Sequence, residues 1–262
     1  MPQGYRSSEL PDTPDYFTKV ALDLVANRYI NTKFGRNAGI GTATTPEDIW
    51  QGGDVYTGQP TSGSPETVEV FSSDGADAPA GTGALTIRFS GLKTTTSTAY
   101  ETEDVTLNGV TAVPTTTTWW RINRAYVLTA GTGGANAGDI TIRHTTTTAN
   151  VFAVMPAGFN QTQIAAWTVP YNNTAIIKRV RTSISRASGA AGSANITIRV
   201  RKPGEVFQAK QNLEVTTSSP ASISFFGGMV LSSMSDIKIR VESVSDNATI
   251  AEAAFEYFLI QA

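Results

Sequence analysis

The chain contains no cysteine and a single histidine, His144. Without thiols it can form no disulfide, no iron–sulfur cluster, and no cysteine-based zinc site or nucleophile. One histidine also makes a His-ligated metal site or a Ser–His catalytic pair hard to build. The sequence therefore predicts no metal ion, no cofactor and no catalytic residue of these kinds.

Charged residues and long apolar runs are also scarce. Lys, Arg, Asp and Glu make up 16% of the 262 residues, and the formal net charge is −2, which argues against a protein that coats nucleic acid. No stretch has the roughly 18 consecutive apolar residues that a membrane span needs. The N-terminal stretch MPQGYRSSELPDTPDYF lacks the apolar core of a signal peptide. We expect neither a membrane nor nucleic acid among the partners.

Thr, Ser, Ala and Gly take the place of the missing charges. This mixture favours strands and tight turns over helices. Apolar residues make up 40% of the chain, and its length has room for one large or two ordinary domains with real cores. The composition predicts an all-β protein.

Two segments of the chain align without a gap. They are residues 113–144, VPTTTTWWRINRAYVLTAGTGGANAGDITIRH, and residues 169–200, VPYNNTAIIKRVRTSISRASGAAGSANITIRV. Each copy is typical of a β-hairpin, with a Val-Pro start, a long strand, a small-residue loop and an Ile-x-Ile strand. Weaker copies of the second strand, LTIRF at 85–89 and IKIRV at 237–241, also follow a strand and a small-residue loop.

Four such hairpins in two pairs predict two tandem antiparallel β-sandwich domains of jelly-roll or immunoglobulin-like type, at residues 38–146 and 147–262. The alternation of apolar residues indicates which side chains face the cores. Ile140 and Ile142 share one face of their strand. Phe255, Tyr257 and Leu259 form the inward face of a closing strand in the second domain.

The segment before these domains differs. Thr13-Pro14-Asp15 is a helix-start signal. An apolar face follows at spacings of three and four, made of Phe17, Val20, Ala21, Leu24 and Val25. A strand is the competing interpretation, because VALDLV also alternates in part. We predict a short helix within an N-terminal arm that spans residues 1–37.

No group of residues has the spacing of a catalytic or calcium-binding motif. Glu47 and Asp48, or Glu101, Glu103 and Asp104, could supply an acid and a base or bind calcium, but acids are also routine at exposed strand ends. The loop GTGGANAG lacks the Lys-Ser/Thr pair and the following helix of a nucleotide site. We expect a non-enzymatic protein.

Basic charge is concentrated in one segment. Residues 178–202 hold seven basic residues and no acid, whereas residues 47–104 hold ten acids and two basic residues. A contact between subunits with complementary charge is one interpretation, and a solvated sheet face protected from aggregation is another. Nucleic-acid binding is the least favoured, because aromatic residues are not interleaved and the acidic segment would repel phosphate.

Trp119-Trp120 and Phe225-Phe226 each place two aromatics side by side on a strand. Since neighbouring strand residues point to opposite faces, one ring of each pair faces away from its own core unless a second layer covers it. An outward ring could form a carbohydrate platform, or pack under a loop, another domain or another subunit.

Two stretches, KFGRNAGIGTATTPEDIWQGGDVY and RINRAYVLTAGTGGANAGDITIR, resemble a family of virion structural proteins of tailed bacteriophages common among marine phages. Lys33, Phe34, Gly35 and Asn37 match its Lys-Phe-Gly-x-Asn element, Arg124 to Val127 its Arg-Ala-Tyr-Val strand, and Thr168 to Pro170 its Thr-Val-Pro entry to a second domain. YNNTA follows that entry here, where Ala-Gly-Lys-Thr-Ala is more usual. The resemblance covers most of residues 33–200 and implies a multicopy particle component, without fixing its place on the particle.

We hypothesise a capsid accessory subunit, either a decoration or cement protein or the base of a head fibre, made in the bacterial host cytoplasm and located on the capsid surface of the virion. Its expected partners are the major capsid protein, other virion proteins and further copies of itself, with a trimer as a plausible symmetry. The stretch KFGRNAGIGTATTPEDIW would join the arm to the first sandwich. The competing hypothesis is a tail or fibre component that binds a host surface glycan or receptor.

The expected interface residues come from the arm, the tryptophan pair and the basic strands. They are Phe17, Val20, Leu24, Lys33, Phe34, Arg36, Trp119, Trp120, Arg179, Arg181 and Arg201.

Overall fold

A computed structural model describes residues 16–60, 64–186 and 192–261 of the chain. These residues form one short helix and many antiparallel strands, so the predicted all-β class is confirmed. The elements are α1 (Tyr16–Ala21), β1 (Arg28–Ile40), β2 (Glu47–Asp48), β3 (Glu66–Ser72), β4 (Ala84–Leu92), β5 (Glu101–Thr106), β6 (Val113–Trp119), β7 (Arg121–Ala130), β8 (Ile140–His144), β9 (Val151–Met155), β10 (Ala166–Thr168), β11 (Asn173–Arg186), β12 (Ser193–Arg201), β13 (Gln208–Thr216), β14 (Ala221–Leu231), β15 (Asp236–Val244) and β16 (Thr249–Gln261).

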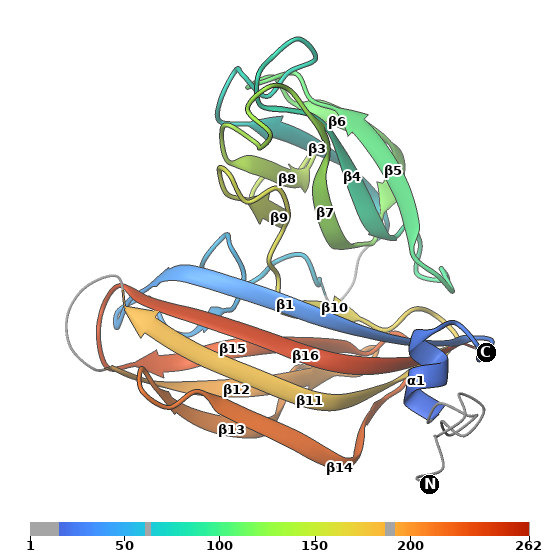
Figure 1. The fold of residues 1–262 in the computed structure, drawn as a ribbon, viewed down its shortest axis with the longest axis vertical. Helices are drawn as coiled ribbons and strands as arrows, with labels where there is room; N and C mark the ends of the chain where they lie inside the picture. The colour runs from blue at the N-terminus through green and yellow to red at the C-terminus, as the bar shows by residue number, and fades with distance from the viewer. Residues whose placement is uncertain (1–15, 61–63, 187–191, 262) are drawn as a thin grey trace, which may run out of the picture.

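The larger of two sandwiches contains the first and the last strands (Figure 1). One sheet has the order β1-β16-β11-β14, and the other has the order β10-β15-β12-β13, with β2 pairing with β15 as well. If β2 and β10 count as two halves of one interrupted strand, this is the strand order of an eight-stranded jelly roll. We call this body the jelly roll.

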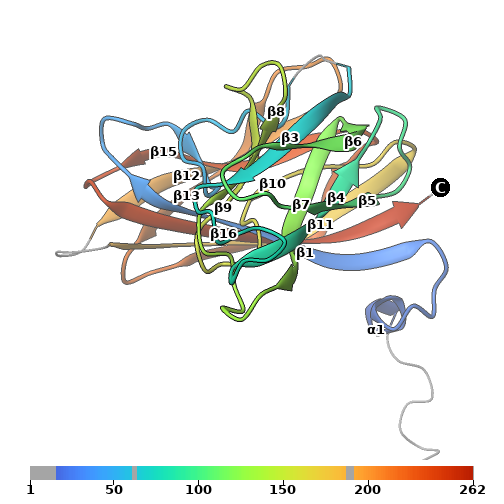
Figure 2. The same ribbon diagram turned by 90° about the horizontal axis from the view of Figure 1, so that it is seen from above.

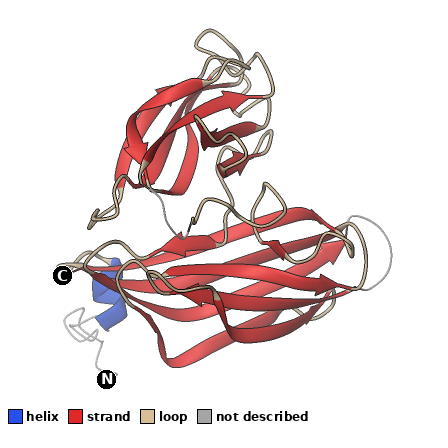
Figure 3. Cartoon of the chain, turned by 180° about the vertical axis from the view of Figure 1, so that it is seen from behind, coloured by secondary structure: helices blue, strands red, loops and turns tan. Residues whose placement is uncertain are grey.

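The smaller sandwich lies between β2 and β10 in the chain. It packs the sheet β6-β3-β8-β9 against the sheet β5-β4-β7. We call it the inserted sandwich. It stands off the edge of the jelly roll formed by β1 and β10, as the views from the front and from behind both show (Figures 1 and 3). The two bodies are therefore nested in the sequence rather than tandem.

The chain leaves the jelly roll and returns to it through two adjacent segments. Trp50 forms an antiparallel bridge with Ile164, and the backbone N–H of Ala165 donates to the carbonyl of Ile49 at 2.9 Å. Gly35 of β1 lies directly against this crossing, because a Cβ at this position would be 2.1 Å from the Ala165 nitrogen. A glycine is required here by close backbone approach.

Each sandwich has its own apolar core. The core of the jelly roll includes Trp167, Ile177, Ile198 and Ile239, and that of the inserted sandwich includes Phe89, Trp119 and Ile87. The predicted inward faces are confirmed, since Ile140 and Ile142 are buried, as are Phe255, Tyr257 and Leu259. Each fully buried large apolar side chain stabilises the fold by roughly 1.5–3 kcal/mol.

Because of the pairing of β1, the two bodies have boundaries that differ from the domain boundaries predicted from the sequence. β1 pairs with β16 from Arg28 opposite Ile260 to Ile40 opposite Thr249. Residues 28–40 therefore belong with the C-terminal strands, whereas the sequence patterns placed residues 1–37 in an arm and 38–146 in a first sandwich. Lys33 to Ile40, expected to begin a joint, is instead strand in the jelly roll. The sequence of a strand does not show which other strand it pairs with. The pairing of β1 with β16, more than 200 residues away, therefore could not be predicted from local patterns.

The predicted short helix is present but brief, and it ends at Ala21. Beyond it Asp23 and Asn27 have positive φ values of 56° and 58°, a conformation that interrupts a helix. Figure 2 shows α1 near the start of β1. In the part of the chain that the structure describes, no helix is long and apolar enough to span a membrane.

The two copies of the internal repeat form equivalent pairs of strands, but the prediction that each copy is a hairpin is wrong. In the first copy β7 pairs with β4 while β8 pairs with β3 and β9, and in the second copy β11 pairs with β14 and β16 while β12 pairs with β13 and β15. The two strands of each copy thus lie in facing sheets and are joined by an arch. The small-residue loop permits this arch, since a Cβ on Gly131 would lie 2.3 Å from the carbonyl oxygen of Gly81.

Candidate functional site

Carboxylates that the sequence offered as acids or metal ligands are engaged in structural contacts. Glu103 accepts hydrogen bonds from Thr116 and Thr117, and Asp104 pairs with Arg88 at 2.6 Å. Across residues 16–60, 64–186 and 192–261, no group of three or more potential ligand side chains could hold a metal ion. We therefore looked for surfaces and buried charges rather than a catalytic centre.

A buried ionic network lies where the two sandwiches meet. Asp236 of β15 accepts a hydrogen bond from Nε of Arg201 at 3.0 Å, another from the hydroxyl of Thr168, and lies 3.6 Å from the guanidinium of Arg121. Arg121 belongs to the inserted sandwich and the others to the jelly roll. Its guanidinium also lies 3.9 Å from the ring centre of Trp120. Burial lowers the pKa of Arg121, and the Asp236 carboxylate opposes that shift.

A second carboxylate ties the crossing segments to β15. Asp48 accepts hydrogen bonds from Lys238 at 2.7 Å, from Arg240 at 2.9 Å and from the backbone N–H of Tyr56 at 2.8 Å. Burial lowers the pKa of Lys238, and Asp48 opposes that shift. Asp236 therefore joins the inserted sandwich to the jelly roll directly, whereas Asp48 joins β15 to the chain segment that leads into the inserted sandwich.

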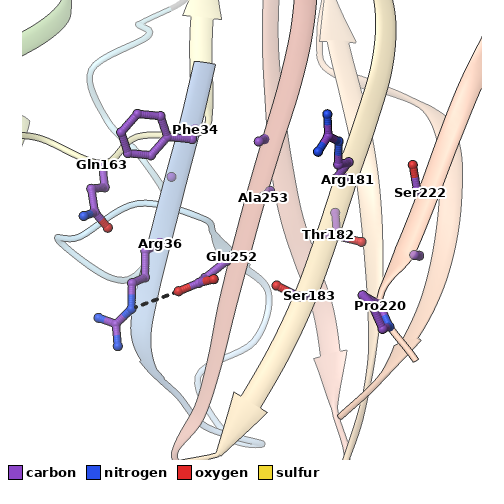
Figure 4. Close-up of a pocket in the computed structure, with 13 residues that line it drawn as sticks. Phe34, Arg36, Gln163, Arg181, Thr182, Ser183, Pro220, Ser222, Glu252 and Ala253 are labelled. Carbon is purple, nitrogen blue, oxygen red and sulfur yellow. Dashed lines mark ion pairs between the residues drawn. The ribbon is translucent and has the colours of Figure 1, made fainter. Parts of the chain in front are cut away.

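A groove of about 520 Å³ crosses the outer face of the β1-β16-β11-β14 sheet (Figure 4). Phe34 and Arg36 project from β1 at one side and Arg181 from β11 at the other, while small residues such as Ala254 and Ser183 form the floor. Nε of Arg36 lies 3.4 Å from Glu252, and Arg181 pairs with Glu256. The groove offers shape and paired charges suited to a protein segment.

An apolar row crosses the same outer face near α1. Ile30, Phe258, Ile176 and Val230 lie directly opposite one another on four successive strands, so their side chains share this face. Phe258 is covered, with the ring of Tyr16 in α1 6.0 Å from its own, but Val230 is 65% exposed and Ile30 40% exposed. We call these four residues the apolar row.

Phe226 projects beside the apolar row. Between the pairs Arg179–Ser224 and Ile177–Met229 the register of β14 shifts, and the extra residues form a bulge. Gly227 and Gly228 of this bulge have φ values of +76° and +92°, which a side chain would strain. Phe226 is fully exposed as a result. Together with the exposed Val230 and Ile30, Phe226 makes this face a candidate contact surface.

The structure brings together some of the sequence-predicted interface residues. Phe34, Arg36 and Arg181 line the groove. Arg179 is exposed on the same strand as Arg181, and Leu24 is 65% exposed beyond α1. Of Phe17 the structure describes only the backbone, so its predicted contact lies outside the described side chains.

Other predicted interface residues are buried within the chain. Val20 is covered, and Arg201 lies in the ionic network. Trp119 packs edge-on against Phe89, and Trp120 is covered by Arg121, so neither tryptophan is an outward ring. Trp119 faces the core of its own sandwich, and Trp120, which lies between β6 and β7, is the ring that Arg121 covers.

The sequence pattern predicted that one ring of Phe225-Phe226 faces outward, and the structure shows that this ring is Phe226. Phe226 was not among the predicted interface residues, and the apolar row was missed. The pair Phe225-Phe226 followed by two glycines was the available signal, because Gly-Gly within a strand marks a bulge. The apolar row could not be seen in the sequence, since it depends on the register between four distant strands.

No family model matches this chain, and no curated protein matches it. Among solved structures it is similar to that of infectious bursal disease virus Gt strain, with 10% identity over 95% of this chain and 78% of the other, and a TM-score of 0.23. The Gx strain structure has 11% identity over 90% and 73%, with a TM-score of 0.26, and the VP2 subviral particle 8% over 89% and 72%, with 0.19. These values are too low to relate the folds, so function is argued from this chain's own residues.

Proposed function

We propose that this chain is a non-enzymatic structural protein of a virion, and more narrowly a capsid accessory subunit, a decoration or cement protein of a tailed bacteriophage. The resemblance of Lys33 to Asn37, Arg124 to Val127 and Thr168 to Pro170 to that class of proteins supports the proposal. The jelly roll is compatible with it, because jelly rolls form viral capsid domains, although lectin domains and cupins use them too.

The observation that carries the proposal is the outer face of the β1-β16-β11-β14 sheet. It combines the apolar row, the exposed Phe226 and the groove lined by Phe34, Arg36 and Arg181. Exposed apolar side chains next to a groove with charge pairs are typical of a protein–protein contact. The partners on this face would be the major capsid protein, another virion protein or a further copy of this chain.

The arrangement of the two bodies suits this role. β14 lies at the edge of its sheet opposite β1, and the inserted sandwich stands off the β1 side (Figure 1). A subunit bound to a particle through β14 and the adjoining face would leave the inserted sandwich projecting. The buried ionic network would keep it at a fixed angle.

The first test is a binding comparison between two surface variants. Phe226→Ser removes the exposed ring of the bulge, and Val206→Ser removes an apolar side chain that is 75% exposed in the turn after β12. We expect Phe226→Ser to reduce co-sedimentation with capsids at least tenfold, as at an interface hot spot, and Val206→Ser to leave it unchanged. Both variants should keep wild-type stability to within about 0.5 kcal/mol. Equal capsid binding by wild type and Phe226→Ser would remove the contact face from the proposal.

The second test places the protein on the particle. Antibody raised against the recombinant chain, detected with gold on intact virions, should label the head across its surface. Gold confined to the tail or its tip would replace the proposal with the tail or fibre hypothesis. Absence of gold from intact particles, with the protein present in disrupted ones, would contradict a surface position.

A further inference from the structure

Lys33 is a buried cation at the junction of the two sandwiches. It is 8% exposed, and its position opposite Phe255 in the β1–β16 register turns its side chain to the inner side of β1. There its Nζ donates a hydrogen bond to the backbone carbonyl of Asn123 in β7. Lys33 therefore links the jelly roll to the inserted sandwich without belonging to the buried ionic network.

Lys33 lacks the counter-ion that the other buried cations have. Arg121 and Arg201 share Asp236, and Lys238 pairs with Asp48. Within the described part of the chain, no carboxylate lies within ion-pair distance of Lys33, and the Asn123 carbonyl is its single hydrogen-bond acceptor. Since an ammonium has three N–H donors, two are left over. A buried charge with no counter-ion is costly, so an anion bound beside Nζ would stabilise the protonated form of Lys33.

A second cation, Arg124, lines the same cavity as Lys33. Arg124 is exposed, donates to the Gln161 side chain at 2.6 Å and lies 5.1 Å from the ring centre of Tyr126. It too has no carboxylate partner among the described residues. Its charge acts on Lys33 in the same direction as burial, so the two cations repel each other across the site.

Both side chains line one small cavity. Its volume is about 70 Å³, and the rest of its wall is formed by Asn31, Thr32, Phe34, Asn123, Thr162 and Tyr257. This is several times the space that one water molecule needs, and too small for a nucleotide or sugar.

We infer that this cavity binds a small inorganic anion, of the size of chloride or phosphate, between Nζ of Lys33 and the guanidinium of Arg124. The anion would supply the missing negative charge and accept the free donors of the ammonium. Because Lys33 and Arg124 come from different sandwiches, a bound anion would strengthen the junction. This site is independent of the proposed function, since it requires no partner protein.

Binding should depend on pH. Burial, reinforced by the charge of Arg124, lowers the pKa of Lys33 to about 7. The titratable groups that face Nζ are Arg124 from β7 and Tyr257 from β16, and Arg36 further along β1 is paired with Glu252. An anion that requires protonated Lys33 therefore binds roughly 30-fold more weakly at pH 8.5 than at pH 6.

The test titrates phosphate, and separately chloride, into the full chain by calorimetry, with ionic strength held constant by a bulky sulfonate. Wild type should bind one anion at pH 6, and chloride, whose own charge does not change with pH, should bind roughly 30-fold more weakly at pH 8.5. Lys33→Met keeps the length of the side chain without its charge and should abolish binding. Arg124→Gln should weaken it at least fivefold. Lys210→Met, at an exposed lysine on β13, is the matched control and should bind like wild type.

Bromide in a crystal of the wild-type protein gives an independent readout. Its anomalous signal should appear beside Nζ of Lys33 and be absent in Lys33→Met. Binding of equal strength in wild type and Lys33→Met, or no binding at pH 6, would overturn the inference. Because anion binding is read directly, a change in the stability of Lys33→Met does not obscure the result.

Discussion

The jelly roll and the inserted sandwich reach the same kind of core by different means. β1 and β16 of the jelly roll have 13 residues each and β11 has 14, whereas β8 and β9 of the inserted sandwich have only five. Long strands bring long ladders of hydrogen bonds and a continuous apolar face. The shorter strands of the inserted sandwich need other support.

That support comes from buried polar side chains that hold its loops. Asp77, which is fully buried, accepts hydrogen bonds from the hydroxyl of Ser72 and from the backbone N–H groups of Ala84, Ala137 and Gly138. The difference teaches that buried carboxylates serve two purposes in this chain. Asp77 orders the loops of the inserted sandwich, whereas Asp236 joins the two bodies.

The largest effect is expected where the two bodies join. Asp236→Ala leaves the buried guanidinium groups of Arg121 and Arg201 without their carboxylate, which should destabilise the protein by about 3–5 kcal/mol. Urea unfolding followed by circular dichroism measures this loss. The control is Asp104→Ala, which removes an exposed partner of Arg88 and should change stability far less. Similar losses in the two variants would show that the junction does not depend on Asp236.

A smaller and more local effect is expected at Asp77. Asp77→Ala leaves its donors unpaired in a buried site and should cost about 3 kcal/mol, confined to the inserted sandwich. Amide hydrogen exchange should lose protection around residues 72–84 and 137–138, while β11 and β16 stay protected. Faster exchange throughout the jelly roll would contradict separate support for the two bodies.

The buried carboxylate of Asp77 also predicts that the stability of the protein falls in acid. Burial would raise the pKa of Asp77, but the Ser72 hydroxyl and the three backbone N–H groups lower it below its usual value. The stability that Asp77 contributes is therefore present above about pH 4 and lost as the pH falls through its folded pKa. Asp77→Ala should remove this part of the acid sensitivity, and its stability should decline less steeply below pH 4.

The smallest effect concerns the lysine between the two bodies. Because the folded pKa of Lys33 is lowered to about 7, the unfolded chain binds more protons than the folded chain between pH 7 and 10. In a buffer without small anions, wild-type stability should gain up to about 2 kcal/mol from pH 7 to pH 9 through Lys33. Lys33→Met should lack this gain, and parallel pH profiles for the two proteins would show that Lys33 keeps its ordinary pKa.

Local patterns predicted what depends on neighbouring residues. The all-β class followed from composition, and the inward faces of Ile140, Ile142 and Phe255 followed from alternation. The repeat identified equivalent strands in both bodies. It did not show that each copy is an arch, because hairpins and arches share strand lengths and small-residue loops, and the choice depends on which sheet receives the second strand.

Contacts between distant residues escaped prediction. Trp120 is covered by Arg121, whose position depends on Asp236, more than 100 residues away in the chain. The candidate face arises only when β1, β16, β11 and β14 align in one register. Of the predicted interface residues, those that proved exposed were predicted from charge or from the arm. The tryptophans failed because Trp119 faces its own core and the sequence does not reveal that Arg121 covers Trp120.

The pairing of β1 with β16 also sets an order of events during synthesis. At about 5–20 residues per second, on the order of ten to forty seconds separate the emergence of these two strands from the ribosome. The inserted sandwich, whose strands run from Glu66 to Met155, is complete well before then and can fold while its host is unfinished. β1 has no strand partner until β16 has been synthesised, so the nascent chain carries an unpaired strand edge throughout this interval.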